Sequence, residues 1–141
     1  MRKYPDRPIV AVGAVVLDRD CVLLVQRGQE PLKGQWSLPG GAVEIGETLE
    51  SALVREVRGE TSLDVVVGEV IEVLDSIRRD SEGRAEYHYI IIDYVCRVPV
   101  GTSTAAAPGT DAADVRWVPL DQLEQYRVSA TAISVIRKAA A

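Results

Sequence analysis

The sequence predicts one domain of mixed helix and strand, in the α/β or α+β class. Runs rich in valine and isoleucine, which are typical of strands, occur near the start of the chain and again after residue 64. One amphipathic helical pattern, between residues 48 and 61, separates these two groups of strands. A chain of 141 residues suits one hydrophobic core, and no linker or repeat divides residues 1–141.

The first quarter of the chain predicts two strands followed by a shaped turn. Residues 8–17 (PIVAVGAVVL) form the first strand, residues 18–20 a turn, and residues 21–27 (CVLLVQR) the returning strand. Residues 28–34 are a polar loop that contains a proline. Residues 36–41 (WSLPGG) then read as a short extended piece that runs into a tight glycine turn.

A helix is expected to begin after Thr48, whose hydroxyl suits the N-cap position. Glu47 and Glu50 suit the positive end of the helix dipole. The pattern ends near Thr61 or Ser62. Four apolar residues form the stripe that faces the core: Leu49, Ala52, Leu53 and Val57.

The second half of the chain predicts a strand hairpin followed by helices. One long or two short strands are expected over 64–77, followed by a charged hairpin loop over 78–84 and the strongest strand of the chain over 86–98. A mobile loop over 99–113 then leads to a strand over 114–118. The chain ends with a short helix over 119–125 and a last helix over 130–140. Ser129 is the expected N-cap of the last helix.

Composition narrows the classes of function. The chain is 47% hydrophobic and 26% charged, as expected of an ordinary globular protein, and its net charge of -5 argues against a nucleic-acid groove. No apolar run approaches membrane-spanning length, and no apolar signal core follows the basic start, so we expect a cytoplasmic protein without membrane partners. The apolar strands permit a homodimer, but no feature requires one.

Two carboxylates carry the strongest chemical signal. Glu56 and Glu60 lie four residues apart in the predicted helix, so they share one face of it. Carboxylates stacked in this way repel each other unless a cation neutralises them. Mg²⁺ is the natural candidate, because proteins usually hold it with a few carboxylates together with substrate phosphates.

The segment from Gly41 to Leu63 resembles the Nudix box, G-x5-E-x7-R-E-U-x-E-E-x-G-U, in which U is aliphatic. Seven residues fall on matching positions: Gly41, Glu47, Arg55, Glu56, Val57, Glu60 and Leu63. Pro39-Gly40-Gly41 is also the usual lead-in of this family. The resemblance is specific because its fixed positions span 23 residues in the right order.

The resemblance implies an α/β/α sandwich with a mixed β-sheet between helices. It also implies hydrolysis of a pyrophosphate bond in a nucleoside diphosphate derivative, with Mg²⁺, or Mn²⁺ in its place, as cofactor. In the family, the metals bind the glutamates of the box and the carbonyl of its first glycine. Carried over, these ligands are Glu56, Glu60 and the carbonyl of Gly41. Arg55 would hold a carboxylate in place, with Glu47 as its mate.

Two residues depart from the box. Gly59 stands where the first glutamate of the E-E pair is expected, which removes one carboxylate and places glycine inside a helix. Ser62 stands where glycine normally takes a left-handed conformation at the helix end, so local strain or a shifted helix end is expected. Glu60, usually the stronger ligand of the pair, is kept. We therefore expect an active enzyme with fewer metal ligands.

A third catalytic carboxylate often comes from a later loop in this family. Asp111 is the first candidate because it precedes Trp117 by six residues, as the acidic residue does in MutT-like relatives; Asp114 and Glu86 are the alternatives. On the substrate side, the candidates are Arg27 for phosphate contact, Gly40 for a shaped turn that binds substrate, and Trp36 for stacking on a base, although a tryptophan beside a turn also suits the core. Arg78, Arg79, Arg84 and Lys33 are further basic candidates for phosphate contact, and Tyr87 or Tyr89 for stacking.

The substrate remains open at this point. The whole chain is most similar to small bacterial proteins of the ADP-ribose pyrophosphatase type, and a MutT-type enzyme that hydrolyses nucleoside triphosphates is the close rival. The alternative from another class is a Nudix-fold nucleotide sensor that binds without cleaving. Such domains usually lose box carboxylates, and Gly59 is a step in that direction. Retention of the other box carboxylates and of Arg55 favours an enzyme.

Overall fold

A seven-stranded mixed sheet forms the centre of the protein in the computed structural model, which describes residues 2–109 and 112–141. Strand β1 (Ile9–Asp18) lies in its middle. It pairs in parallel with β6 (Ala85–Arg97), and on its other edge it pairs antiparallel with β4 (Gly40–Ala42). β1 therefore places the glycine turn beside the centre of the sheet.

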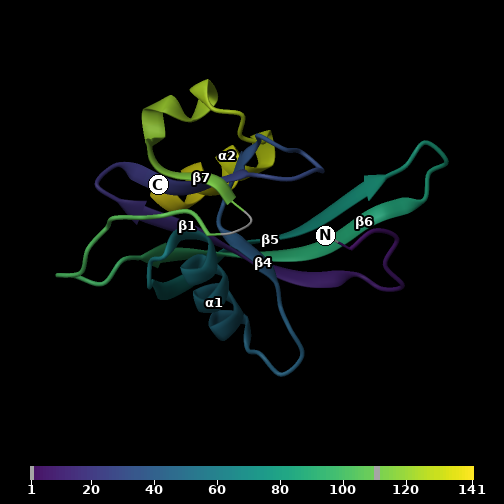
Figure 1. Cartoon of the computed structure of the whole chain (residues 1–141), viewed down its shortest axis with the longest axis horizontal. Helices are drawn as coiled ribbons and strands as arrows, with labels where there is room; N and C mark the ends of the chain where they lie inside the picture. Colours follow the sequence, from purple (N-terminus) through teal and green to yellow (C-terminus); the bar gives the residue numbers. More distant parts are fainter. Residues whose placement is uncertain (1, 110–111) are drawn as a thin grey trace.

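The remaining strands extend the sheet on both sides (Figure 1). The order is β3-β2-β1-β6-β5, with β7 paired to β2. The bounds are Cys21–Arg27 for β2, Trp36–Ser37 for β3, Val66–Arg79 for β5 and Ala112–Pro119 for β7. β5 and β6 form a long hairpin that projects from the body of the protein (Figure 1).

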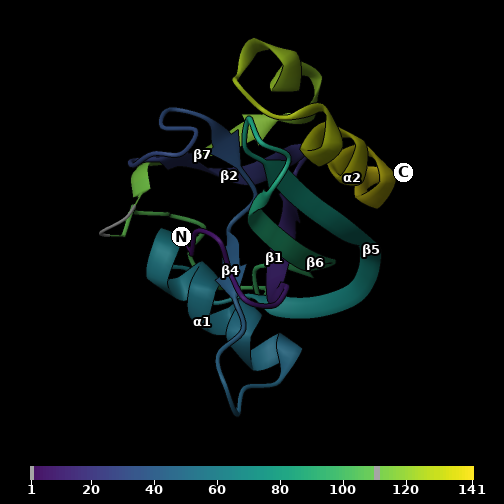
Figure 2. The ribbon, with the colours of Figure 1, turned by 90° about the vertical axis from the view of Figure 1, so that its right-hand side faces the viewer.

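Helices cover both faces of the sheet, as Figure 2 shows. Helix α1 (Leu49–Thr61) packs on one face, where Ala52, Leu53 and Val57 join one core cluster. Helix α2 (Ala130–Ala140) covers the other face after the short 3-10 helix η1 (Leu120–Gln125). The α/β/α sandwich implied by the sequence is confirmed. Within the described ranges, no helix is long and apolar enough to cross a membrane.

The structure differs from the sequence-based expectation in two segments. The hairpin loop is shorter than predicted, because β5 continues through Arg78 and Arg79. Charged residues are tolerated there since β5 is an edge strand with exposed side chains. The loop expected to be mobile over 99–113 is anchored in its described part: the amides of Ala107 and Gly109 donate hydrogen bonds to carbonyls of α1.

One carboxylate is buried in the middle of the sheet. Asp93 on β6 is 3% exposed and lies opposite Gly13 of β1. A Cβ atom at Gly13 would lie 2.2 Å from Asp93 Oδ1, so glycine is what leaves room for the carboxylate. Burial, and secondarily the negative charge of Glu72, raise the pKa of Asp93 to about 6. Ionised Asp93 therefore weakens the fold.

Replacing this carboxylate should stabilise the protein in a pH-dependent way. Below about pH 4 Asp93 is protonated in both folded and unfolded chains, so its charge costs no stability. Between about pH 4 and pH 6 the unfolded chain loses the proton first, and stability falls. Asp93→Asn should remove that loss, gaining about 2 kcal/mol between pH 4 and 7.5 in urea unfolding. The exposed Asp75→Asn is the control; equal gains in both variants would contradict this assignment.

Candidate active site

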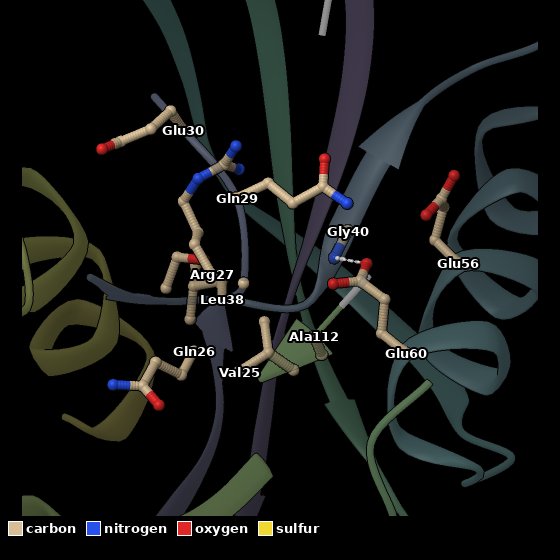
Figure 3. Close-up of a pocket in the computed structure, with 12 residues that line it drawn as sticks. Val25, Gln26, Arg27, Gln29, Glu30, Leu38, Gly40, Glu56, Glu60 and Ala112 are labelled. Carbon is tan, nitrogen blue, oxygen red and sulfur yellow. Dashed lines mark hydrogen bonds between the residues drawn. The ribbon is translucent and has the colours of Figure 1, made fainter. Parts of the chain in front are cut away.

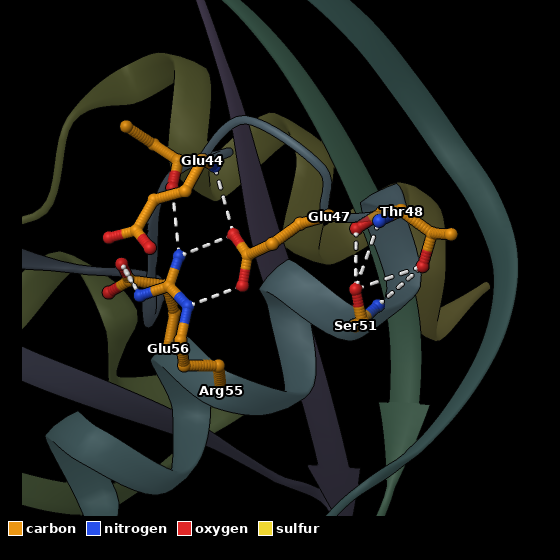
Figure 4. Close-up of polar contacts among 7 residues, drawn as sticks. Glu44, Glu47, Thr48, Ser51, Arg55 and Glu56 are labelled. Atoms are coloured by element: carbon orange, nitrogen blue, oxygen red, sulfur yellow. Dashed lines mark hydrogen bonds and ion pairs between the residues drawn. The ribbon is translucent and has the colours of Figure 1, made fainter.

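The start of α1 is fixed by a capping box. Thr48 is the N-cap, its hydroxyl accepts the Ser51 amide hydrogen bond, and Ser51 Oγ accepts one from the Thr48 amide (Figure 4). These bonds satisfy backbone donors that a helix start leaves free. The expected N-cap is confirmed, and the cap sets where the side chains of the first turns point.

Arg55 is the hub of the polar contacts behind the glycine turn (Figure 4). Its Nε donates to Glu47 Oε2 over 2.6 Å and its Nη2 to Glu47 Oε1 over 2.9 Å, which makes a two-point contact. Nη1 donates to Glu56 Oε1 over 2.8 Å, and Nη2 also reaches the Ala42 carbonyl. The Arg55 guanidinium holds the pKa of Glu47 at about 2. Arg55 thereby joins the turn, the helix start and Glu56.

We do not expect lysine at position 55 to hold both Glu47 and Glu56 as Arg55 does. An ammonium group has no planar fork, so it cannot hold Glu47 at two points while also binding Glu56. We expect Arg55→Lys to raise the metal concentration for half-maximal activity about tenfold. Stability should change by at most about 1 kcal/mol, since the Arg55 side chain is 38% exposed.

The matched control is Arg58→Lys on the same helix. Arg58 makes an exposed ion pair with Asp64, away from the glycine turn. Metal titration of both variants is the measurement. An unchanged metal requirement in Arg55→Lys would show that Arg55 does not orient Glu56.

Glu60 lies against the glycine turn, one helical turn beyond Glu56. Its Oε1 accepts a hydrogen bond from the Gly40 amide over 3.0 Å. Burial, opposed by this bond and reinforced by the charge of Glu56, raises the pKa of Glu60 to about 8. Without a cation, the Glu60 carboxyl group therefore tends to keep its proton at neutral pH, and a bound cation would favour its ionised form.

Gly41 allows the turn to approach the other carboxylate. A Cβ atom at Gly41 would lie 2.6 Å from the Glu56 carboxyl carbon and 2.7 Å from both of its oxygens. Only glycine therefore leaves the Glu56 carboxylate beside the backbone at this point. The two helix carboxylates and the turn that precedes the helix converge on one place.

Gly40, Glu56 and Glu60 border a cavity of about 400 Å³, drawn in Figure 3. Its walls come from the end of β2 and the following loop, from the β3–β4 segment, from α1 and from the start of β7. The lining residues are Val25, Gln26, Arg27, Gly28, Gln29, Glu30, Ser37, Leu38, Gly40, Glu56, Glu60 and Ala112. A cavity with carboxylates on one wall and an arginine on another suits a phosphate-bearing ligand together with a cation.

The donor set suits a hard divalent cation. The carboxylates of Glu56 and Glu60 both border the cavity, and oxygen ligands are those that Mg²⁺ prefers. No cluster of three or more acidic, histidine or cysteine side chains able to hold a metal occurs among residues 2–109 and 112–141. Any further ligands of a cation at this place would come from outside the side chains of Glu56 and Glu60, and substrate phosphates are such ligands for Mg²⁺ in proteins.

A family model, the NUDIX domain, matches residues 7–139. The chain belongs to the Nudix family. Among curated relatives, it is 38% identical to an ADP-ribose pyrophosphatase of Methanocaldococcus jannaschii over 82% of this chain and 64% of that protein. It is 35% identical to a putative 8-oxo-dGTP diphosphatase 2 of Mycobacterium tuberculosis over 81% of this chain and 82% of that protein.

Solved structures give the same family. The NUDIX domain of Shewanella oneidensis NrtR, in a complex with ADP ribose, has a TM-score of 0.75 and 25% sequence identity, and covers 96% of this chain and 88% of that one. The chain spans less of the M. jannaschii relative, 64% of its length.

The structure brings most of the sequence-predicted site residues of this Nudix domain together. Glu56, Glu60, Arg27 and Gly40 line the cavity, while Arg55 and Glu47 lie behind it. Of the basic residues considered for phosphate contact, only Arg27 is among the lining residues. Arg27 Nε also donates to the Pro31 carbonyl over 2.7 Å, which fixes the side chain against its own loop.

The structure places Trp36, a candidate for stacking on a base, in the hydrophobic core and not in the cavity wall. Trp36 is 7% exposed and belongs to the core cluster under α2. Its ring packs edge-on against Tyr126, with centroids 5.5 Å apart, and the Arg116 guanidinium lies over it. The indole is therefore used in packing and is absent from the cavity lining.

Three residues were candidates for the third carboxylate: Asp111, Asp114 and Glu86. Asp111 lies outside the described residues. Of the two alternatives, Asp114 accepts hydrogen bonds from the Val115 amide and from Arg116, and Glu86 forms an ion pair with Lys3. Neither alternative is among the lining residues of the cavity.

Sequence reasoning missed several polar residues of the cavity. Gln29 and Glu30 come from the loop after β2, and Ser37 from β3. The amide of Gly40, which binds Glu60, was also not foreseen. The available signal was the polar composition of residues 28–34 directly after Arg27, which marks a loop but not the direction in which its side chains point.

Proposed function

We propose that this protein hydrolyses the pyrophosphate bond of a nucleoside diphosphate derivative in a reaction that depends on Mg²⁺ or Mn²⁺. The observation that supports this most is the convergence of Glu56, Glu60 and the glycine turn at one end of a cavity with Arg27 in its wall. A protein with a net charge of -5 needs local positive charge to accept an anionic substrate, and Arg27 supplies it in the cavity wall.

Each side chain has a distinct role in this proposal. Glu56, Glu60 and the Gly41 carbonyl would hold the cation, which when bound neutralises the phosphate oxygens and helps to generate the attacking hydroxide. Arg55, fixed by Glu47, holds the Glu56 carboxylate in position. The Gly40 amide does the same for Glu60. Arg27 would bind a phosphate group.

ADP-ribose is the substrate we propose to test first. The M. jannaschii relative is named for this pyrophosphatase activity, and the NrtR domain is in a complex with ADP ribose. A nucleoside triphosphate is the second candidate, because the M. tuberculosis relative is named as a putative 8-oxo-dGTP diphosphatase.

The experiment incubates the protein with ADP-ribose, 8-oxo-dGTP and the common nucleoside triphosphates, with Mg²⁺, with Mn²⁺ or with a chelator. We expect AMP and ribose 5-phosphate from ADP-ribose in the presence of metal only. A nucleoside monophosphate and pyrophosphate from the triphosphates would move the substrate to the second candidate. Absence of product from every compound would contradict the proposed hydrolysis.

A sensor that binds without cleaving is the alternative function, and Gly59 is the observation that favours it. Calorimetry with ADP-ribose distinguishes the two functions. Binding in the presence of metal, without any product after long incubation, would identify the sensor. Retention of Glu56, Glu60, Arg55 and Glu47 leads us to expect turnover.

We also propose Asp111 as the third carboxylate. It precedes Ala112, a residue of the cavity wall, whereas Asp114 is engaged by Arg116. Asp111→Asn should therefore slow hydrolysis at least about tenfold, and Asp114→Asn should change it little. A larger loss in Asp114→Asn than in Asp111→Asn would reverse the assignment.

A further inference from the structure

Residues 103–109, which we name the strap, lie against the C-terminal end of α1. The Ala107 amide donates to the Thr61 carbonyl over 2.9 Å, and the Gly109 amide donates to the Glu60 carbonyl over 3.1 Å. The Ser62 hydroxyl donates to the Ala107 carbonyl over 3.1 Å. The last carbonyls of a helix have no partner within the helix, so the strap satisfies groups that would otherwise need water.

Close backbone contact fixes the end of the strap. A Cβ atom at Gly109 would lie 1.9 Å from the Gly59 carbonyl oxygen and 3.0 Å from its carbon, so only glycine permits this approach. At Gly59 itself, a Cβ atom would have no neighbour within 4 Å. A side chain at position 109 would therefore block the contact between strap and helix, whereas a side chain at position 59 would not.

The rest of the strap is anchored to the sheet layer. Trp117 Nε1 donates to the Thr104 carbonyl over 2.8 Å, and Ala106 packs against the core cluster under α1. The strap thus contacts the rest of the protein at Thr104, Ala106, Ala107 and Gly109, although its sequence of small residues predicts a mobile loop. It leads to β7, whose first residue, Ala112, lines the cavity.

One departure from the Nudix box lies in this contact. Ser62 takes the left-handed conformation, with φ of 66°, at the position where the family has glycine. Such a conformation is unfavourable for a residue with a side chain. The hydroxyl compensates by its bond to Ala107, which glycine is unable to make.

We propose that the strap is a positioning element for the active site and that Ser62 and Gly109 are its positioning residues. Glu60 is held at two points: its carboxylate by the Gly40 amide and its carbonyl by the Gly109 amide. Three residues after Gly109, Ala112 pairs with Arg27. The docked strap therefore holds the backbone of the proposed metal ligand Glu60 at the end of α1. The positioning role rests on the proposed hydrolysis, whereas the docking does not.

Hydrogen exchange of the Ala107 amide, followed by NMR in the free protein, tests the docking. Gly109→Ala should displace the strap and speed this exchange about tenfold or more. The matched control, Gly59→Ala, adds a methyl group on the other side of the same contact, where there is open space. Its Ala107 amide should exchange as slowly as in the parent protein. Parent-like exchange in Gly109→Ala would overturn the proposal.

Two substitutions at Ser62 separate positioning from stability. Both Ser62→Ala and Ser62→Gly remove the hydroxyl, but glycine relieves the left-handed backbone, so Ser62→Gly should have the higher Tm. If the strap positions the site, kcat should fall in both Ser62 variants. In Gly109→Ala, kcat should fall about tenfold. Loss of kcat in Ser62→Ala alone would mean that activity follows stability, and the positioning role would be wrong.

Failure of the proposed hydrolysis would leave this test intact. If the parent protein cleaves no substrate, the Kd for Mn²⁺, measured by electron paramagnetic resonance, replaces kcat as the measure of Glu60 placement. Gly109→Ala should then raise this Kd about tenfold, and Gly59→Ala should leave it unchanged. An unchanged Kd in Gly109→Ala would overturn the positioning role.

Discussion

Glu60→Gln should lower turnover by about 10²-fold or more while the protein stays folded. Among the described residues, Glu60 is the one carboxylate that is partly buried, borders the cavity and accepts a bond from the glycine turn. Glutamine keeps the shape of the side chain but removes the charge that would hold the cation. The loss should appear in kcat and in the metal concentration for half-maximal activity together.

The fold should survive this substitution for an electrostatic reason. Burial and the charge of Glu56 raise the pKa of Glu60 to about 8, so the metal-free protein already holds a neutral carboxyl group near pH 7. A glutamine amide resembles that neutral group, and its oxygen can accept the Gly40 hydrogen bond. The Tm without metal should therefore be equal to that of the parent or higher.

Glu50→Gln is the matched control, because Glu50 is exposed on the same helix and absent from the cavity lining. It should retain full turnover. A folded Glu60→Gln protein with a near-normal rate would falsify the assignment of Glu60 as a metal ligand. Reduced turnover in both variants would instead indicate a general sensitivity to the charge of α1.

The elements that sequence predicts best are those whose pattern is set locally. The apolar runs of β1, β2 and β6 and the stripe of α1 are read directly from period and composition. The Thr48 cap and the contact of Arg55 with Glu47 are also predicted from the sequence. Both involve only residues of α1 and of the turn directly before it. The spacing of the box thus predicts geometry as well as family.

The elements that sequence misses depend on contacts between distant segments. Trp36 beside a turn suits either a base or the core, and the decision comes from Tyr126, ninety positions further along the chain. The strap reads as mobile because composition reports no backbone hydrogen bonds to a helix end. Arg78 and Arg79 read as a loop, because charge alone does not distinguish a loop from an exposed edge strand.

Alanine substitution at the two glycines of the turn should damage different properties: stability at Gly40 and metal binding at Gly41. A Cβ atom at Gly40 would lie 2.0 Å from the Val12 carbonyl oxygen and 2.9 Å from Gly13 Cα, both in the backbone of the central strand β1. Neither atom can move without breaking the ladder between β1 and β4. Gly40→Ala should therefore cost about 3 kcal/mol of the free energy of unfolding.

Gly41→Ala should instead leave the fold nearly intact and damage the metal site. The three atoms nearest to its Cβ atom would all belong to the Glu56 carboxylate, at 2.6–2.7 Å, and that carboxylate is the end of a flexible side chain. We expect a loss of stability below about 1 kcal/mol, with Glu56 displaced from Arg55 and from the cation. The metal concentration for half-maximal activity should rise about tenfold. Urea unfolding and metal titration of both variants are the measurements. A Gly41→Ala protein with a normal metal requirement would mean that the Glu56 carboxylate lies elsewhere when the cation is bound.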